Sequence, residues 1–201
     1  RIAAEMHAEG LVTTDEALLL VEPDHLDQLL HDQIDPDAQL EILGVGLPAS
    51  PGGAQGEIVF TAEAAVAAVE EGRKVLLVRR ETSPEDIGGM DAAIGILTAR
   101  GGMTSHAAVV ARGMGKCCVA GVSDILIKDK AKKFSVGNVT IKEGDWISLD
   151  GSAGQVIKGQ LATVEPKLSG DFGKFLAMCD KIRKLGVRTN ADTPADAKRA
   201  R

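Results

Sequence analysis

Aromatic residues are scarce in this 201-residue chain, making up 2% of it with one Trp, four Phe and no Tyr. Nucleic-acid sites combine clustered positive charge with aromatic or polar readers, whereas this chain has a net charge of −6 and no such cluster. The composition therefore argues against nucleic acid as a partner.

Long apolar runs are also missing from the chain. No stretch approaches the ~20 residues needed to cross a bilayer, and the first residues do not form the apolar core of a secretory signal. We therefore expect no membrane partner and an intracellular protein. The composition does not distinguish the cytoplasm from a plastid or a glycosome.

Cysteine is infrequent, with three residues at positions 117, 118 and 179. Two adjacent cysteines on one strand point to opposite faces of a sheet, and no spacing in the chain is typical of a metal cluster. Such a set makes a poor disulfide framework and fits a reducing compartment. The pattern favours packing roles for Cys117 and Cys118, and it predicts no metal site.

Changes of pattern divide the chain into four segments. Residues 1–40 are charged and helical in period, with helix starts predicted at Thr13-Thr14 and after Pro23-Asp24. Residues 164–185 form an amphipathic helical stretch. Residues 41–163 carry short β-rich runs separated by glycine, and residues 186–201 form a short remainder. The chain has no initial Met and opens inside a helical pattern, so we expect a fragment of a longer polypeptide.

The central segment predicts an α/β fold. Thr61 caps a helix that stops at Gly72, and Ser83-Pro84 starts another. Parallel strands alternating with helices, followed by hairpins, indicate a layered β/β/α unit. The expected strands cover residues 42–45, 57–60, 74–78, 93–98, 117–120, 133–136, 139–142, 146–149 and 155–158.

The most informative motif runs from Gly101 to Arg112, where a buried strand passes into a helix. His106 is expected in the first helical turn, whose N–H groups have no partner within the helix and attract anions. The sequence therefore predicts a cradle for a phosphoryl group around His106. The residues expected to support it are the loop glycines and hydroxyls Gly101, Gly102, Thr104 and Ser105.

Histidine suits this chemistry because a substantial fraction of imidazole is neutral and nucleophilic near neutral pH. We interpret His106 as a residue that carries phosphate covalently. The alternative is that Thr104 or Ser105 is an ordinary helix cap and His106 a polar residue on an exposed turn.

Three further residues are candidates for contact with the phosphate. Arg112 lies six residues beyond His106, a spacing that puts it off the histidine's face of the helix. A pairing or docking role is therefore as well supported as phosphate contact. Thr82 and Ser83 follow the strand at 74–78, at the edge where sites of parallel sheets gather. Their hydroxyls could reach the phosphate, although helix capping is the favoured reading.

The run from Gly101 to Arg112, continued to Gly121, resembles the phosphohistidine signature of the phosphoenolpyruvate (PEP)-utilising enzymes. The resemblance extends over the whole chain. It implies that His106 is catalytic and that residues 41–163 form a swivelling phosphohistidine domain. Cys117 and Cys118 resemble the dikinase branch, whereas the sugar-transport phosphotransferase Enzyme I and the PEP synthases usually have a proline-containing stretch there.

The resemblance further implies a parent enzyme that converts ATP, phosphate and pyruvate into AMP, diphosphate and PEP. Residues 1–40 and 164–185 would be linkers, and residues 186–201 the start of a barrel that binds PEP or pyruvate. ATP and Mg²⁺ would bind to domains outside this chain, and the nucleotide-binding domain and the barrel would be its partners in a homodimeric parent. In plant relatives the residue matching Thr104 is a regulatory phosphorylation site.

Two other functions stay open at this point. The first is an Enzyme I-like phosphocarrier that passes its phosphoryl group to a protein. The second is a non-catalytic module whose glycine turn binds the phosphate or carboxylate of a partner.

Overall fold

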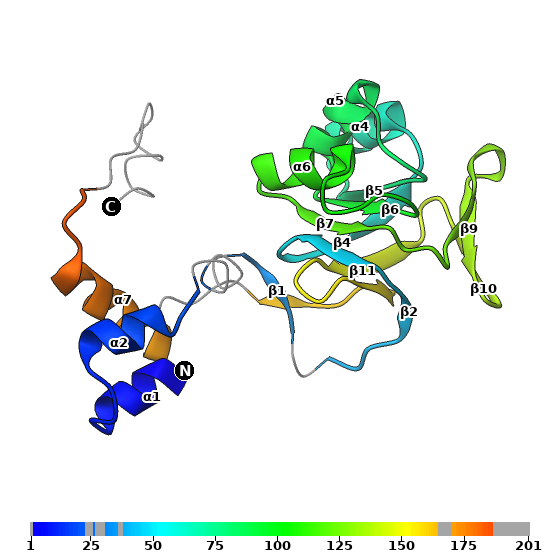
Figure 1. Cartoon of the computed structure of the whole chain (residues 1–201). Helices are drawn as coiled ribbons and strands as arrows, with labels where there is room; N and C mark the ends of the chain where they lie inside the picture. Colours follow the sequence, from blue (N-terminus) through cyan, green and yellow to red (C-terminus); the bar gives the residue numbers. More distant parts are fainter. Residues whose placement is uncertain (1, 23–25, 27–30, 36–37, 165–169, 187–201) are drawn as a thin grey trace. The chain divides into compact units, whose positions relative to one another are not determined.

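The computed structural model describes residues 2–22, 26, 31–35, 38–164 and 170–186 (Figure 1). The chain divides into two compact units, one formed by residues 1–22 and 167–201 and the other by residues 23–166. No helix among the described residues is long and apolar enough to span a membrane.

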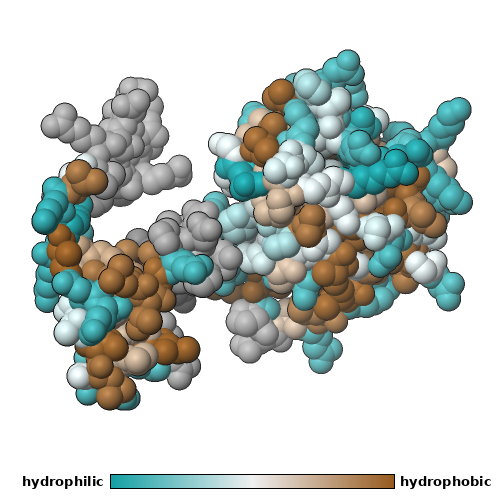
Figure 2. Space-filling model, in the orientation of Figure 1, coloured by the Kyte–Doolittle hydropathy of each residue, from teal (hydrophilic) through white to brown (hydrophobic). Residues whose placement is uncertain are grey.

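The smaller unit contains three helices, α1 (Ile2–Ala8), α2 (Thr14–Leu19) and α7 (Gly170–Ile182), which contact one another. Thr13 caps α2 as the sequence predicts, because its backbone N–H donates to Glu16 Oε2 at 2.8 Å and its hydroxyl accepts from Glu16 N at 3.3 Å. Figure 2 shows apolar surface on this unit, and Leu19 is 86% exposed. The helix start predicted after Pro23 lies outside the described residues.

An eight-stranded mixed sheet is the centre of the larger unit. Its strand order is β2-β12-β11-β4-β5-β6-β7-β3, with β4 to β7 parallel and the remaining pairs antiparallel. The strands are β2 (Ile42–Val45), β3 (Leu47–Ser50), β4 (Gly53–Val59), β5 (Val75–Arg79), β6 (Gly95–Thr98), β7 (Cys117–Ala120), β11 (Trp146–Asp150) and β12 (Gln155–Lys158).

Helices connect the parallel strands and cover one face of this sheet. They are α4 (Ala62–Glu70), the 3-10 turn η1 (Pro84–Asp86), α5 (Ile87–Ala92) and α6 (His106–Gly113). Small side chains such as Ala65 and Ala108 pack there against Leu77 and Ile96. The capping of α4 by Thr61 is confirmed, since its hydroxyl accepts from Ala64 N at 3.1 Å.

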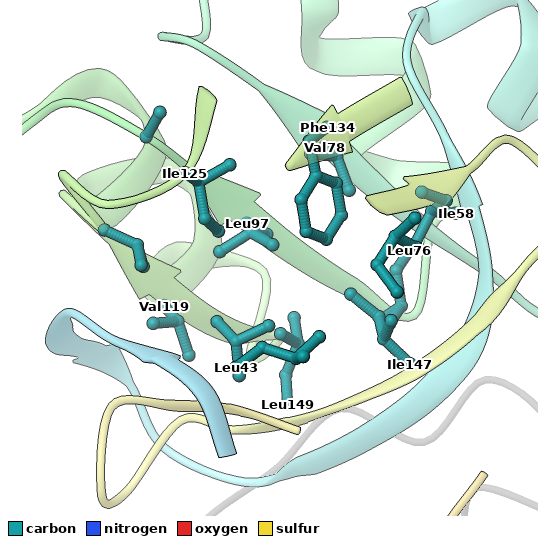
Figure 3. Close-up of a cluster of buried hydrophobic side chains, with 14 of the residues drawn as sticks. Leu43, Ile58, Leu76, Val78, Leu97, Val119, Ile125, Phe134, Ile147 and Leu149 are labelled. Atoms are coloured by element: carbon teal, nitrogen blue, oxygen red, sulfur yellow. The ribbon is translucent and has the colours of Figure 1, made fainter. Parts of the chain in front are cut away.

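The other face of the sheet carries a larger core. Figure 3 shows Leu76 and Leu97 of the parallel strands gathered with Ile147 and Phe134 in this core. Phe134 belongs to a three-stranded antiparallel sheet in the order β10-β9-β8, formed by β8 (Leu126–Lys128), β9 (Lys133–Val136) and β10 (Val139–Lys142), with η2 (Asp129–Ala131) between β8 and β9. The predicted β/β/α layering of the central segment is confirmed.

The outer face of this small sheet has a row of like charges. Lys133 lies directly opposite Lys128 on one neighbouring strand and Lys142 on the other. Phe134, the next residue, points into the core and is fully buried. Because like charges directly opposite each other repel, the row lowers the stability of the sheet.

The structure corrects the sequence at several strands. β4 begins four residues before the predicted strand at Glu57, because the glycine run lets the backbone pass close to its neighbour: a Cβ at Gly56 would lie 2.7 Å from the Lys74 carbonyl oxygen. β3 was not predicted from the sequence, because it contains Pro48. This proline is tolerated because β3 is an edge strand of the sheet. Three short strands were not predicted either, namely β8, β1 (Gln33–Ile34) and β13 (Thr163–Val164).

Candidate active site

His106 is the first residue of α6, immediately after β6 and its glycine loop. Ser105 caps this helix: its backbone is extended and its Oγ accepts from Ala108 N at 3.4 Å. The sequence prediction that His106 opens a helix after a buried strand is confirmed. The imidazole is therefore held at the positive end of the helix, half-buried and reachable from solvent.

Two glycines shape the loop in front of the histidine. Gly101 has φ +117°, and a Cβ there would lie 2.9 Å from Ser105 Oγ. Gly121, at the end of β7, has φ +67°, and a Cβ there would lie 2.5 Å from the Gly101 carbonyl oxygen. These contacts explain why both positions require glycine. Gly102 is exposed and has space for a side chain, so sterics do not explain its glycine.

Thr82 makes the most specific contact to the histidine. Its Oγ1 lies 2.9 Å from His106 Nδ1, within hydrogen-bond distance. Thr82 belongs to the loop after β5, so two neighbouring βα loops supply the two side chains. Helix capping, the role favoured for Thr82 from sequence, is wrong for this residue, because its hydroxyl lies against the imidazole.

A cleft of about 250 Å³ opens beside the ring. Four predicted site residues meet in it: Thr82, Gly101, Ser105 and His106. Three further residues complete its lining, namely Glu81, Arg100 and Ala107. Glu81 and Arg100 are not among the site residues predicted from the sequence. The sequence does contain a signal for both residues. Each directly precedes a predicted site residue, in a loop at the carboxyl edge of the parallel strands.

Ser83 does not line the cleft. Its backbone N–H donates to Asp86 Oδ2 at 2.9 Å and its hydroxyl donates to the same oxygen at 3.3 Å, where η1 begins. Asp86 is buried and forms an ion pair with Arg79 at 3.2 Å. The predicted helix-start role of Ser83 is confirmed.

Arg112 and Thr104 also lie apart from the cleft lining. The Arg112 guanidinium reaches back along α6 and donates to the Met103 carbonyl oxygen. This contact is of the pairing kind that the sequence left open, and it ties the end of the helix to the loop before it. Thr104 is exposed on that loop.

The adjacent cysteines pack on opposite faces of the sheet. Cys118 belongs to the core between the sheet and the helices, and Cys117 to the larger core on the other face. Burial raises the pKa of Cys118 to about 12 and raises the pKa of Cys117 further. Neither thiol is therefore ionised near neutral pH, which confirms the predicted packing role. Among the described residues, no group of three His, Cys, Asp or Glu side chains could hold a metal ion.

Residues 71–154 match the family model described as PEP-utilising enzyme, mobile domain. Residues 71–154 of this chain are therefore similar to the mobile domain of PEP-utilising enzymes. The matched segment includes all residues that line the cleft and the whole of α6.

Three curated proteins match the chain over 98–100% of its length. The chain is 58% identical over 201 residues to "Pyruvate, phosphate dikinase" of Rhizobium meliloti, covering 100% of the chain and 22% of that protein. It is 57% identical over 203 residues to "Pyruvate, phosphate dikinase 1, chloroplastic" of Arabidopsis thaliana, covering 100% of the chain and 21% of that protein. It is 56% identical over 198 residues to "Pyruvate, phosphate dikinase" of Clostridium symbiosum, covering 98% of the chain and 23% of that protein.

The chain thus spans 21–23% of the length of these relatives. A solution structure of Enzyme I aligns with 54% of the chain and 37% of that protein at 22% identity and a TM-score of 0.31, a similarity too low to carry an argument.

Proposed function

We propose that this chain is the phosphoryl-carrier part of a pyruvate, phosphate dikinase, with His106 as the residue that is transiently phosphorylated. The overall reaction would convert ATP, phosphate and pyruvate into AMP, diphosphate and PEP. The observation that carries the proposal is the hydrogen-bond contact between Thr82 Oγ1 and His106 Nδ1 at the edge of an open cleft.

The contact supports Nε2 as the nucleophile. When Nδ1–H donates to the Thr82 hydroxyl, the lone pair is on Nε2. That lone pair attacks phosphorus and forms the N–P bond, while the P–O bond to the leaving oxygen breaks and its electrons stay on that oxygen. No proton has to leave the ring in this step, and Nδ1–H keeps its partner afterwards.

Other residues would support the bound group. Gly101 and Gly102 let the backbone approach, Ser105 and the start of α6 present donors, and Thr104 sits on the exposed loop beside them. Arg112 would contribute indirectly, by fixing the loop at Met103. Phosphorylation of Thr104 would add negative charge to this loop and oppose arrival of the phosphoryl group at His106.

The remaining parts of the reaction would lie outside this chain. We propose that residues 1–40 and 164–185 are linkers, that residues 186–201 begin a barrel for PEP or pyruvate, and that residues 41–163 swivel between the barrel and a nucleotide-binding domain. ATP and Mg²⁺ would be held by those domains in a homodimeric parent.

Chemical phosphorylation of this chain tests the carrier role directly. With phosphoramidate as donor, intact mass should show one added phosphoryl unit, and ³¹P NMR should place it on Nε2 of His106 as an acid-labile, base-stable adduct. His106→Ala should abolish the adduct. An adduct on other histidines only, or none, would contradict the proposal and favour a non-catalytic binding module.

A second experiment separates the dikinase from a phosphocarrier of the Enzyme I type. The full-length polypeptide containing this chain is incubated with labelled PEP, and then with AMP and diphosphate. A dikinase should form ATP and phosphate with loss of the histidine label. Retention of the label until a small acceptor protein is added would instead indicate the carrier.

A further inference from the structure

Two opposite charges line the cleft that contains His106. Arg100 lies in the loop after β6 and Glu81 in the loop after β5. They are the charged side chains of the lining other than the histidine itself. Their Nη1 and Oε1 atoms are 3.8 Å apart, at the long end of ion-pair distances. Of the other nearby charges, Arg112 is engaged with the Met103 carbonyl.

The main chain fixes where these two side chains start. Arg100 N donates to the Arg80 carbonyl oxygen at 2.8 Å, and Ala99 N donates to the Arg79 carbonyl oxygen at 3.1 Å. The loop bearing Glu81 and the loop bearing Arg100 are thereby joined at their bases. Only the side chains need to move when the cleft is filled.

The ion pair between them is easily broken. The side chains of Arg100 and Glu81 are 76% and 63% exposed, and such pairs contribute little because water screens them. A phosphoryl group is a stronger competitor for the guanidinium, since it carries up to two negative charges and matches the two-pronged geometry of arginine.

We propose that Arg100 is a phosphoryl-binding residue, which exchanges its pair with Glu81 for the phosphoryl group on His106, while Glu81 opposes the charge of that group. This inference rests on the proposed function of His106. The two side chains would balance each other, so that the group is held on the ring and remains ready to leave.

The phosphoryl group itself reports the balance, through the pKa of its second ionisation. A cation beside it favours the dianion and lowers its pKa, so Arg100→Gln should raise that pKa. A carboxylate beside it disfavours the dianion, so Glu81→Gln should lower it. For exposed partners we expect shifts of about half a unit, which is about a threefold change in the ionisation equilibrium.

The experiment uses the whole chain phosphorylated with phosphoramidate, with the ³¹P shift of the His106 adduct followed against pH. Arg100→Lys should recover part of the wild-type value. Arg183→Gln is the matched control, since it removes an exposed, ion-paired arginine that directly follows α7 and should leave the pKa unchanged. Thermal unfolding of each variant confirms that it is folded.

The outcomes distinguish this inference from the function beneath it. Opposite shifts in Arg100→Gln and Glu81→Gln support the exchange. If His106 is labelled but its phosphoryl pKa equals the wild-type value in both variants, or moves in the same direction in both, the role of the pair is overturned. The carrier function stays intact in that case. Absence of label on His106 overturns both.

Discussion

Replacing Thr82 with valine isolates the hydrogen bond that orients the nucleophile. Valine keeps the shape of threonine but cannot accept from Nδ1–H across the 2.9 Å contact. A hydrogen bond between neutral groups contributes about 1 kcal/mol, and the cleft lets water reach the ring, so no larger desolvation penalty adds to it. With Nδ1–H as the donor, which is the direction that we propose, the population of the tautomer with its lone pair on Nε2 should therefore fall about fivefold relative to the other tautomer.

¹⁵N NMR of the imidazole measures that tautomer ratio, and phosphoramidate labelling measures the rate at which Nε2 reacts. Both should fall in Thr82→Val and recover in Thr82→Ser, which restores a hydroxyl. Thr140→Val, at an exposed threonine on β10, serves as the matched control and should change neither. The reasoning is refuted if Thr82→Val has the wild-type tautomer ratio and labelling rate while remaining folded.

Three other substitutions or treatments follow from the structure. Gly121→Ala places a Cβ 2.5 Å from the Gly101 carbonyl at φ +67°, so we expect a loss of about 1–3 kcal/mol in urea unfolding, and wild-type stability would contradict the clash. Lys133→Thr removes repulsion from a lysine on each side and should stabilise the chain by about 0.5 kcal/mol in the same assay; destabilisation would show that packing outweighs charge. Burial raises the pKa of Cys118 to about 12 and that of Cys117 further, so iodoacetamide at pH 8 should modify neither in the native chain and both after denaturation, as mass spectrometry would show. Because these folded-state values exceed the ordinary thiol pKa of 9.0, unfolding should become easier as pH rises above about 9, and a flat stability curve there would argue against buried thiols.

Most of the regular structure was predictable because its signals are local. Caps at Thr13 and Thr61 and the strand periods at 117–120 and 133–136 depend on neighbours a few residues away, and the structure confirms them. The strands that were not predicted depend on contacts with distant parts of the chain. β3 contains Pro48, and its pairing with β7 compensates for a poor local pattern.

The site shows the same division. The position of His106 behind a glycine bend was evident from consecutive residues, and the structure places it there. The roles of Thr82 and Arg112 were not, because each depends on an atom outside its own local element: the imidazole Nδ1 for Thr82 and the Met103 carbonyl for Arg112. Hydroxyl and guanidinium groups pair with many partners, so their residue types alone do not select one.

The sequence alone determined that a histidine stands at the start of a helix. The glycine conformations, the Ser105 cap and the strand pattern that place it there all act over a few neighbouring residues. What only the tertiary structure decided is the surroundings of that histidine. Thr82 is 24 residues before His106, and the two meet because β5 and β6 lie side by side and parallel, bringing the loops at their carboxyl ends together with Glu81 and Arg100. Such long-range pairing depends on the order of the strands in the sheet, which follows from burial of both its faces.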